Sequence, residues 1–157
     1  HSVKTTGRPG PKDGTFEKFK TNDLDVRNPP LLPFGYGLSY TTFEYSNLKL
    51  NKNEIMQGEG IAAKVTVTNT GNYDGEEVVQ LYLRDVVRSI TPPRRELKGF
   101  HKLLLKKGES KEVTITLSPN DLKFYNGQLE FVSEVGKFEV FVGTNSDAQL
   151  SETFTLK

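Results

Sequence analysis

The chain has 157 residues, a length that predicts one domain with room for an additional arm. Its 21 basic and 20 acidic residues are interspersed, so we expect no charged surface that would bind nucleic acid or an anionic membrane. The absence of cysteine excludes disulfides, thiolate nucleophiles and cysteine-based metal sites, and no apolar run is long enough to span a bilayer.

Residues 1–33 have the composition of an arm rather than of a packed domain. Prolines stand at positions 9, 11, 29, 30 and 33, and Phe16 and Phe19 are the only large apolar side chains before Leu24. Such a segment stays extended because it has little to bury. The chain begins with His1 and its only methionine is Met56, so we expect a piece of a longer protein.

The character of the sequence changes between Pro33 and Phe43, a segment that we call the seam (Pro-Phe-Gly-Tyr-Gly-Leu-Ser-Tyr-Thr-Thr-Phe). If the seam is a strand, alternation places Phe34, Tyr36 and Tyr40 on one face, together with Leu38. Bulky side chains gathered on one side require a partner surface. The seam is therefore predicted to join something upstream to a β domain downstream.

Alternating apolar and polar residues follow from Phe43 to Leu156. A period of two is typical of antiparallel strands that have one buried face and one face in water. The residues expected to share one core are Val65, Val67, Leu81, Leu83, Val113, Ile115, Val140 and Val142. The residues expected outside the core or under loops are Lys64, Thr66, Gln80, Thr114 and Glu139.

Three local signals interrupt the alternation. The phase slips near Ser46-Asn47 and again around Leu97, Phe100 and Leu104, which predicts one β-bulge near Ser46-Asn47 and another at Gly99. Ser118-Pro119-Asn120-Asp121 combines a capping serine, a proline suited to a first helical position and an acid at the capping-box position. This combination predicts a single helical turn.

Seven to nine short strands separated by turn signals describe an all-β fold, an immunoglobulin-like or fibronectin type III β-sandwich with an extended N-terminal arm. The chain has neither cysteine nor tryptophan, the residues that mark true immunoglobulin domains. We therefore predict a sandwich of the fibronectin type III kind.

The seam resembles the signature that opens the C-terminal fibronectin type III-like domain of family 3 glycoside hydrolases, the β-glucosidases, β-xylosidases and their relatives. Thr5-Thr6-Gly7-Arg8-Pro9 is similar to the end of the α/β sandwich domain that precedes it there. Further similar stretches are 69–75, 77–82, 97–100, 107–109 and 136–143. The chain departs from the family pattern at Phe131, where Trp is common, and at Val135, where Pro is usual.

The resemblance implies three parts: the tail of a preceding α/β sandwich domain at 1–9, a linker arm at 10–33 and a fibronectin type III-like domain at 34–157. It also implies that both catalytic carboxylates lie elsewhere in the parent chain. Glu76 and Glu77 are neighbours on one strand and point to opposite faces, unlike a catalytic pair. His1 and His101 are far apart in the sequence. We expect no catalytic residue, no cofactor and no metal site.

Candidate domain-interface residues come from two segments. The first is the seam, with Phe34, Tyr36 and Tyr40. The second is the proline-stiffened loop from Val86 to Arg95, which carries Arg88, Arg94 and Arg95. This loop is either a solvated basic connection or a contact loop whose arginines pair with carboxylates of a neighbouring domain.

The favoured interpretation is a non-catalytic accessory domain that braces the catalytic domains of the same parent chain. The resemblance implies that the parent is a β-glucosidase-like hydrolase of terminal β-linked sugars, periplasmic or secreted from a bacterium. The alternative is an independent sugar-binding or adhesion module, because aromatic rings are also used to bind sugars. Alone, the chain is expected to cover its seam with the arm, through Phe16, Phe19 and Leu24, or by self-association.

Overall fold

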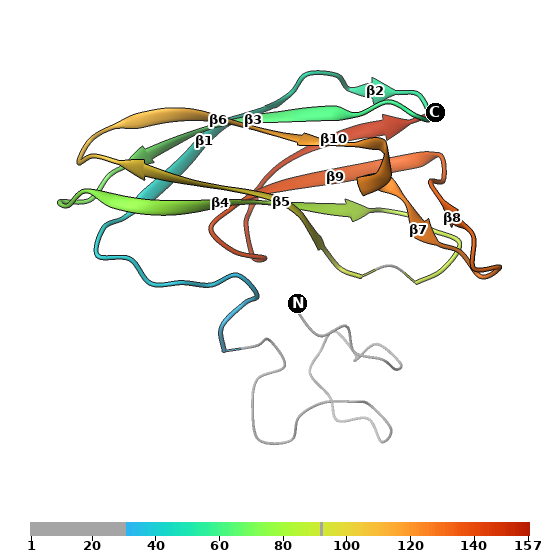
Figure 1. Cartoon of the computed structure of the whole chain (residues 1–157), viewed down its shortest axis with the longest axis horizontal. Coiled ribbons are helices and arrows are strands. Elements are labelled where there is room, and N and C mark those ends of the chain that lie inside the picture. The colour runs from blue at the N-terminus through green and yellow to red at the C-terminus, as the bar shows by residue number, and fades with distance from the viewer. Residues whose placement is uncertain (1–30, 92) are drawn as a thin grey trace, which may run out of the picture.

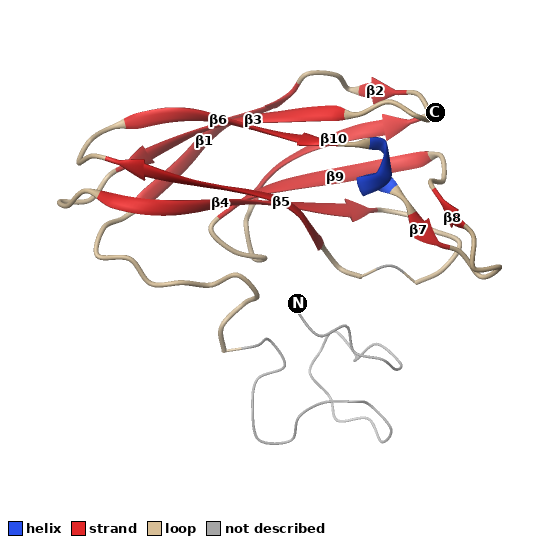
Figure 2. Ribbon diagram, in the orientation of Figure 1, coloured by secondary structure: helices blue, strands red, loops and turns tan. Residues whose placement is uncertain are grey.

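The computed structural model describes residues 31–91 and 93–157. Within these ranges, two β-sheets pack face to face, and a short two-stranded ribbon lies at one end (Figures 1 and 2). This is the all-β sandwich that the alternating pattern predicted. The expected tail at residues 1–9, nearly all of the expected arm, and the covering residues Phe16, Phe19 and Leu24 lie outside the described residues.

The smaller sheet has the order β1-β3-β6 and the larger sheet the order β2-β10-β9-β4-β5. The pairs are antiparallel except for the short parallel pair of β2 with β10. The strands of these two sheets are β1 (Phe43–Leu50), β2 (Glu54–Ile55), β3 (Ile61–Asn69), β4 (Gly75–Asp85), β5 (Glu96–Leu105), β6 (Ser110–Leu117), β9 (Gly136–Gly143) and β10 (Leu150–Leu156). The ribbon pairs β7 (Phe124–Tyr125) with β8 (Phe131–Val132).

The core lies between the two sheets and contains the residues that the alternation selected. Val65 and Val113 are paired neighbours in the smaller sheet, and Leu83 and Val140 are paired in the larger one. All eight predicted core residues belong to one buried cluster. Each buried side chain of this size contributes about 1.5–3 kcal/mol. Of the residues predicted to lie outside the core, Lys64 is exposed and Gln80 is buried, not in the core but beneath the seam.

Both predicted irregularities in the strands are present. In β1 the pairing with β3 shifts between Ser46 and Lys49, and Asn47 takes a positive φ of 55°. In β5 the extra residue is Lys98 and not its predicted neighbour Gly99, because Leu81 pairs with Gly99 and Tyr82 pairs with Leu97. Gly99 itself faces the core, where a Cβ would lie 2.7 Å from Ile115 Cγ2. Glycine is thus needed there for close packing of the two sheets.

The predicted helical turn is a 3-10 helix, η1 (Pro119–Leu122). The backbone amide of Asp121 donates to the carbonyl oxygen of Ser118 at 3.0 Å, and the amide of Ser118 donates to the Asp121 carboxylate at 2.7 Å. Leu122 at the end of this turn is buried in the core. The turn therefore closes one end of the sandwich between β6 and β7.

Candidate functional site

The seam is not a strand. It begins with a turn in which the amide of Tyr36 donates to the carbonyl of Pro33 at 3.1 Å, and it ends where β1 starts at Phe43. Gly35 in that turn has a φ of +80°, a left-handed conformation that favours glycine. The expected sharing of one face by strand alternation therefore does not occur. The bulky side chains are presented by an irregular segment instead.

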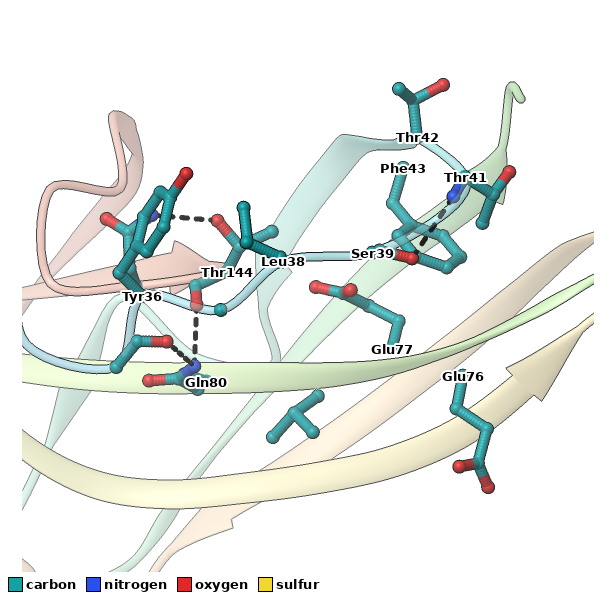
Figure 3. Close-up of a pocket in the computed structure, with 14 residues that line it drawn as sticks. Tyr36, Leu38, Ser39, Thr41, Thr42, Phe43, Glu76, Glu77, Gln80 and Thr144 are labelled. Atoms are coloured by element: carbon teal, nitrogen blue, oxygen red, sulfur yellow. Dashed lines mark hydrogen bonds between the residues drawn. The ribbon is translucent and has the colours of Figure 1, made fainter. Parts of the chain in front are cut away.

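The front of the seam is bound to the outer face of the larger sheet (Figure 3). The amide nitrogen of Gln80 donates to the carbonyl oxygens of Gly35 at 3.0 Å and of Thr144 at 2.6 Å. The hydroxyl of Tyr82 donates to Gln80 Oε1 at 2.5 Å. The backbone amide of Ser146 adds a hydrogen bond of 2.9 Å to the carbonyl of Phe34. Two side chains on β4 and the loop after β9 thus hold the first residues of the seam.

This attachment leaves no room for a side chain at position 35. A Cβ on Gly35 would lie 2.1 Å from Gln80 Oε1 and 2.6 Å from the hydroxyl oxygen of Tyr82. Gly37, two residues later, has nothing within 4 Å of an added Cβ. The two glycines of the seam therefore serve different purposes, and only Gly35 is required by the contact with the sheet.

The back of the seam is fixed by a buried polar residue at the end of β3. The hydroxyl of Thr41 donates to Asn69 Oδ1 at 2.6 Å. The side-chain nitrogen of Asn69 in turn donates to the carbonyls of Tyr73 at 2.8 Å and of Leu105 at 3.0 Å. The seam is therefore anchored at both ends. Within the described part of the chain, the backbone amides of residues 37–40 between these anchors have no hydrogen-bond acceptor.

The large side chains of the seam point largely into solvent. Phe34 is 52% exposed, Tyr36 is 45% exposed and Tyr40 is 99% exposed. These are the three candidate interface residues predicted in the seam. Their backbone is positioned by the domain while their rings are left accessible, which is the arrangement that an interface with another domain requires. Their role in such an interface stays a prediction.

A cleft of about 610 Å³ lies between the seam and the first half of β4. β9 pairs with β4 only from Gln80 to Asp85, so the seam lies beside the part of β4 that has no neighbour on that side. Glu77 points toward the seam and Glu76 points away from it (Figure 3). The two neighbours thus point to opposite sides of the strand, as the alternation predicted. Glu76 forms an ion pair of 2.6 Å with Lys102 on β5.

Glu77 is a buried carboxyl group with one hydroxyl partner. The hydroxyl of Tyr45 on β1 donates to Glu77 Oε1 at 2.5 Å. Burial raises the pKa of Glu77, although the hydrogen bond from Tyr45 acts in the opposite direction. Burial and the neighbouring Glu77 raise the pKa of Tyr45. The pair joins β4 of the larger sheet to β1 of the smaller sheet.

The loop from Val86 to Arg95 is held by two of its arginines. The guanidinium of Arg88 is nearly inaccessible and bonds Asp85 at 3.0 Å and Glu96 at 2.9 Å. Burial raises the pKa of Asp85 despite this neighbouring cation. Arg95 donates to the carbonyls of Ser146 at 2.6 Å and Ala148 at 2.7 Å. Both guanidinium groups are therefore bound within the domain.

Each of these arginines also covers an aromatic ring. The guanidinium carbon of Arg88 lies 4.6 Å from the centre of the Phe124 ring, and that of Arg95 lies 3.6 Å from the centre of the Phe141 ring. Arg94 is exposed on the surface. Of the three arginines named as interface candidates, Arg94 is the exposed one, and the interface role of all three stays a prediction.

The described residues contain no group of three His, Asp or Glu side chains that could hold a metal ion. No helix among them is long and apolar enough to cross a membrane. The seam region presents exposed rings above a hydrogen-bonded attachment.

The sandwich is a fibronectin type III-like domain. Residues 77–146 match the model of the family described as "Fibronectin type III-like domain". The chain is 42% identical over 156 residues to a periplasmic β-glucosidase of Salmonella typhimurium, covering 99% of this chain and 20% of that protein. It is 44% identical over 139 residues to a putative β-xylosidase of Formosa agariphila, covering 88% of this chain and 18% of that protein.

Solved structures give the same result. A β-glucosidase from Listeria innocua in complex with glucose matches with a TM-score of 0.85 and 41% identity, over 99% of this chain and 21% of that one. β-Glucosidase 3B of Thermotoga neapolitana matches with a TM-score of 0.73 and 43% identity, over 82% of this chain and 18% of that one. The chain spans about a fifth of these relatives. It belongs with the fibronectin type III-like domains that form the C-terminal fifth of family 3 β-glucosidases and β-xylosidases.

Proposed function

We propose that this chain is a non-catalytic accessory domain that braces the catalytic domains of a β-glucosidase-like family 3 glycoside hydrolase. The seam is the observation that carries the proposal. Hydrogen bonds from Gln80 and Thr41 hold its ends, while the rings of Tyr36 and Tyr40 remain exposed. Aromatic side chains are enriched at protein interfaces because they bury a large area at a small entropic cost.

The relatives of this chain support the part of the proposal that concerns the whole parent enzyme. Homologous domains stand in chains about five times as long, alongside the catalytic domains of β-glucosidases and β-xylosidases. We infer that the parent hydrolyses terminal β-linked sugars and that residues 1–9 and 10–33 are the tail of the preceding domain and a linker. The Salmonella relative is periplasmic, and we propose a periplasmic or secreted location here as well.

Sugar binding by the isolated domain is the competing function. A sugar site needs free donors and acceptors beside its aromatic rings. In the cleft under the seam, Gln80 uses its amide nitrogen on two carbonyls and its oxygen on Tyr82. Asn145 bonds Thr144 and the amide of Asp147. These two side chains are occupied inside the domain, whereas the backbone amides of residues 37–39 beside the cleft have no acceptor within the described residues. The bracing function is therefore favoured by the exposed rings together with the domain context of the relatives, not by a lack of free donors.

Scanning calorimetry of the parent enzyme tests the bracing function. Replacing Tyr36 and Tyr40 together with serine should lower the unfolding temperature of the catalytic domains or separate one transition into two. Tyr73→Ser, which removes a similarly exposed ring from the turn between β3 and β4, is the matched control and should leave the profile unchanged. If the double variant unfolds like the wild type, the seam does not brace the enzyme.

The isolated chain should also release no nitrophenol from aryl β-glycosides, because the family's catalytic carboxylates are expected outside it. A steady release that is abolished by Glu77→Gln would contradict the non-catalytic role. Titration of the chain with oligosaccharides separates the competing function, since an affinity that Tyr36→Ser removes would favour a sugar-binding module.

A further inference from the structure

The outer face of β4 and β5 carries apolar side chains that the seam does not cover. Phe100 and Leu104 on β5 are 69% and 53% exposed. They pair with Gln80 and Glu76, which alternate along β4 with residues of the core. Alternate residues of a strand point to opposite faces, so Phe100 and Leu104 lie on the side of the sheet turned away from the core.

Two further residues extend this surface. Val78 lies between Glu76 and Gln80 on the same face of β4, and Leu97 pairs with Tyr82 across the bulge in β5. Both are partly exposed. We call these residues the outer apolar face: Val78, Leu97, Phe100 and Leu104.

The outer apolar face is continuous with the seam. Val78 lines the same cleft as Tyr36 and Leu38. Gln80, which stands opposite Phe100 in the sheet, is also the residue that holds Gly35 of the seam. The sheet and the seam therefore present one surface, with the seam along one side of it.

The seam and the outer apolar face together lie at the upper end of what an isolated domain exposes. At ~200 Å² per ring, the exposed parts of Phe34, Tyr36, Tyr40 and Phe100 amount to on the order of 500 Å². The aliphatic side chains beside them add to this value. The largest apolar patch of a typical monomer is about 300–600 Å², and a stable interface buries about 800 Å² on each partner. The combined surface approaches the size of a complete interface.

We propose that the outer apolar face is the part of the interdomain interface that the preceding α/β domain of the parent chain covers, an inference that rests on the proposed function. Homologous domains form the C-terminal fifth of their enzymes, so the remaining chain leads into the seam. The seam borders this face at Gln80 and Val78, and the preceding domain joins the seam through the expected linker at 10–33.

The charges on this face define the chemistry of the partner. Lys102, which projects between Phe100 and Leu104, is paired with Glu76 at 2.6 Å. Arg84, farther along the same face of β4, is paired with Glu139 on β9 at 3.3 Å. Because these charges neutralise each other within the domain, the partner surface needs no charged residues of its own. It should be apolar, with small or aliphatic side chains that accommodate the Phe100 ring.

Hydrogen exchange in the parent enzyme tests this assignment. Phe100→Ser combined with Leu104→Ser should speed exchange at a surface of the preceding domain by about tenfold or more. Phe100→Tyr, which keeps the ring, should restore most of the protection when Leu104 is intact. Met56→Ser, which alters an equally exposed apolar side chain beyond β2, should change nothing. The urea midpoint of each variant of the isolated chain verifies that the sandwich stays folded.

The other outcomes overturn the assignment in different ways. If the double variant leaves exchange unchanged while Tyr36→Ser with Tyr40→Ser accelerates it, the domain braces the enzyme through the seam alone. If neither pair of changes has an effect, the bracing function itself is wrong. A third outcome is that the amides of the outer apolar face are protected from exchange only in the isolated chain. If dilution removes this protection, a second copy occupies the face. If removal of residues 1–30 removes it, the arm occupies the face.

Discussion

A single methyl group at position 35 should release the seam from the sheet. Gly35→Ala places a side chain at a φ of +80°, which costs roughly 1–2 kcal/mol for any residue with a Cβ. The new Cβ would also lie 2.1 Å from Gln80 Oε1 and 2.6 Å from the Tyr82 hydroxyl, far inside van der Waals contact. Both groups are fixed by hydrogen bonds, so neither can move aside at no cost.

The loss of stability in Gly35→Ala cannot exceed the stability that the attached seam contributes to the domain, because the seam can detach. If the front of the seam detaches, the domain loses the hydrogen bonds from Gln80 to Gly35 and from Ser146 to Phe34, at about 0.5–1.5 kcal/mol each. Detachment also exposes the Tyr82 side chain, which is buried when the seam is attached. We therefore expect Gly35→Ala to lower the free energy of unfolding by about 2–4 kcal/mol.

Urea denaturation of the isolated chain measures this loss. With a slope of about 2 kcal/mol per molar urea, the midpoint should fall by roughly 1–2 M. Gly37→Ala is the control within the same segment, because an added Cβ there meets nothing within 4 Å, and its change should stay within about 0.5 kcal/mol. Equal midpoints for the two variants would refute the attachment of the seam described above.

Three further perturbations test other parts of the structure. Val65→Ala should lower the free energy of unfolding by about 1–4 kcal/mol, whereas Lys64→Ala on the opposite face should have little effect in the same urea titration. Arg95→Lys should lower it by about 1–3 kcal/mol, because one ammonium cannot reproduce the paired carbonyl contacts and the stacking on Phe141. Burial raises the pKa of Glu77 above its ordinary value of 4.5, so the wild type should lose stability as the pH rises above 4.5 through the folded-state pKa. Glu77→Gln should lack that loss, and identical pH profiles of unfolding for the two proteins would contradict the burial of an ionisable group at this position.

Strand content was predictable where burial follows the period of the side chains. Val113 and Ile115 alternate with Thr114 in a strand that has one side on the core, so the sequence records directly which side is buried. The bulges and the turn at Ser118 were predictable for a similar reason, since each leaves a local mark in the alternation or in the capping residues. These features depend on residues within a few positions of one another.

The conformation of the seam and the role of the arginines depend on residues that are distant in the sequence. Gln80 holds Gly35 from 45 positions away, and Arg95 reaches the carbonyl of Ser146 across 51 positions. No local pattern contains these contacts. Gln80 and Tyr82 stand on the face of β4 that lies outside the core. Nothing near them in the sequence shows that the seam covers both side chains. The exposed rings of the seam were expected to need a partner, and that expectation stays a prediction.

The backbone amides in the middle of the seam offer the most direct test of the bracing role. Within the described residues, the amides of 37–40 have no acceptor, so in the isolated chain they should exchange with solvent almost as fast as in an unstructured peptide. In the parent enzyme, burial of the seam against the catalytic domains should slow their exchange by about tenfold or more. Exchange of these amides in the parent enzyme at the rate of an unstructured peptide would contradict the claim that the domain braces its enzyme through the seam.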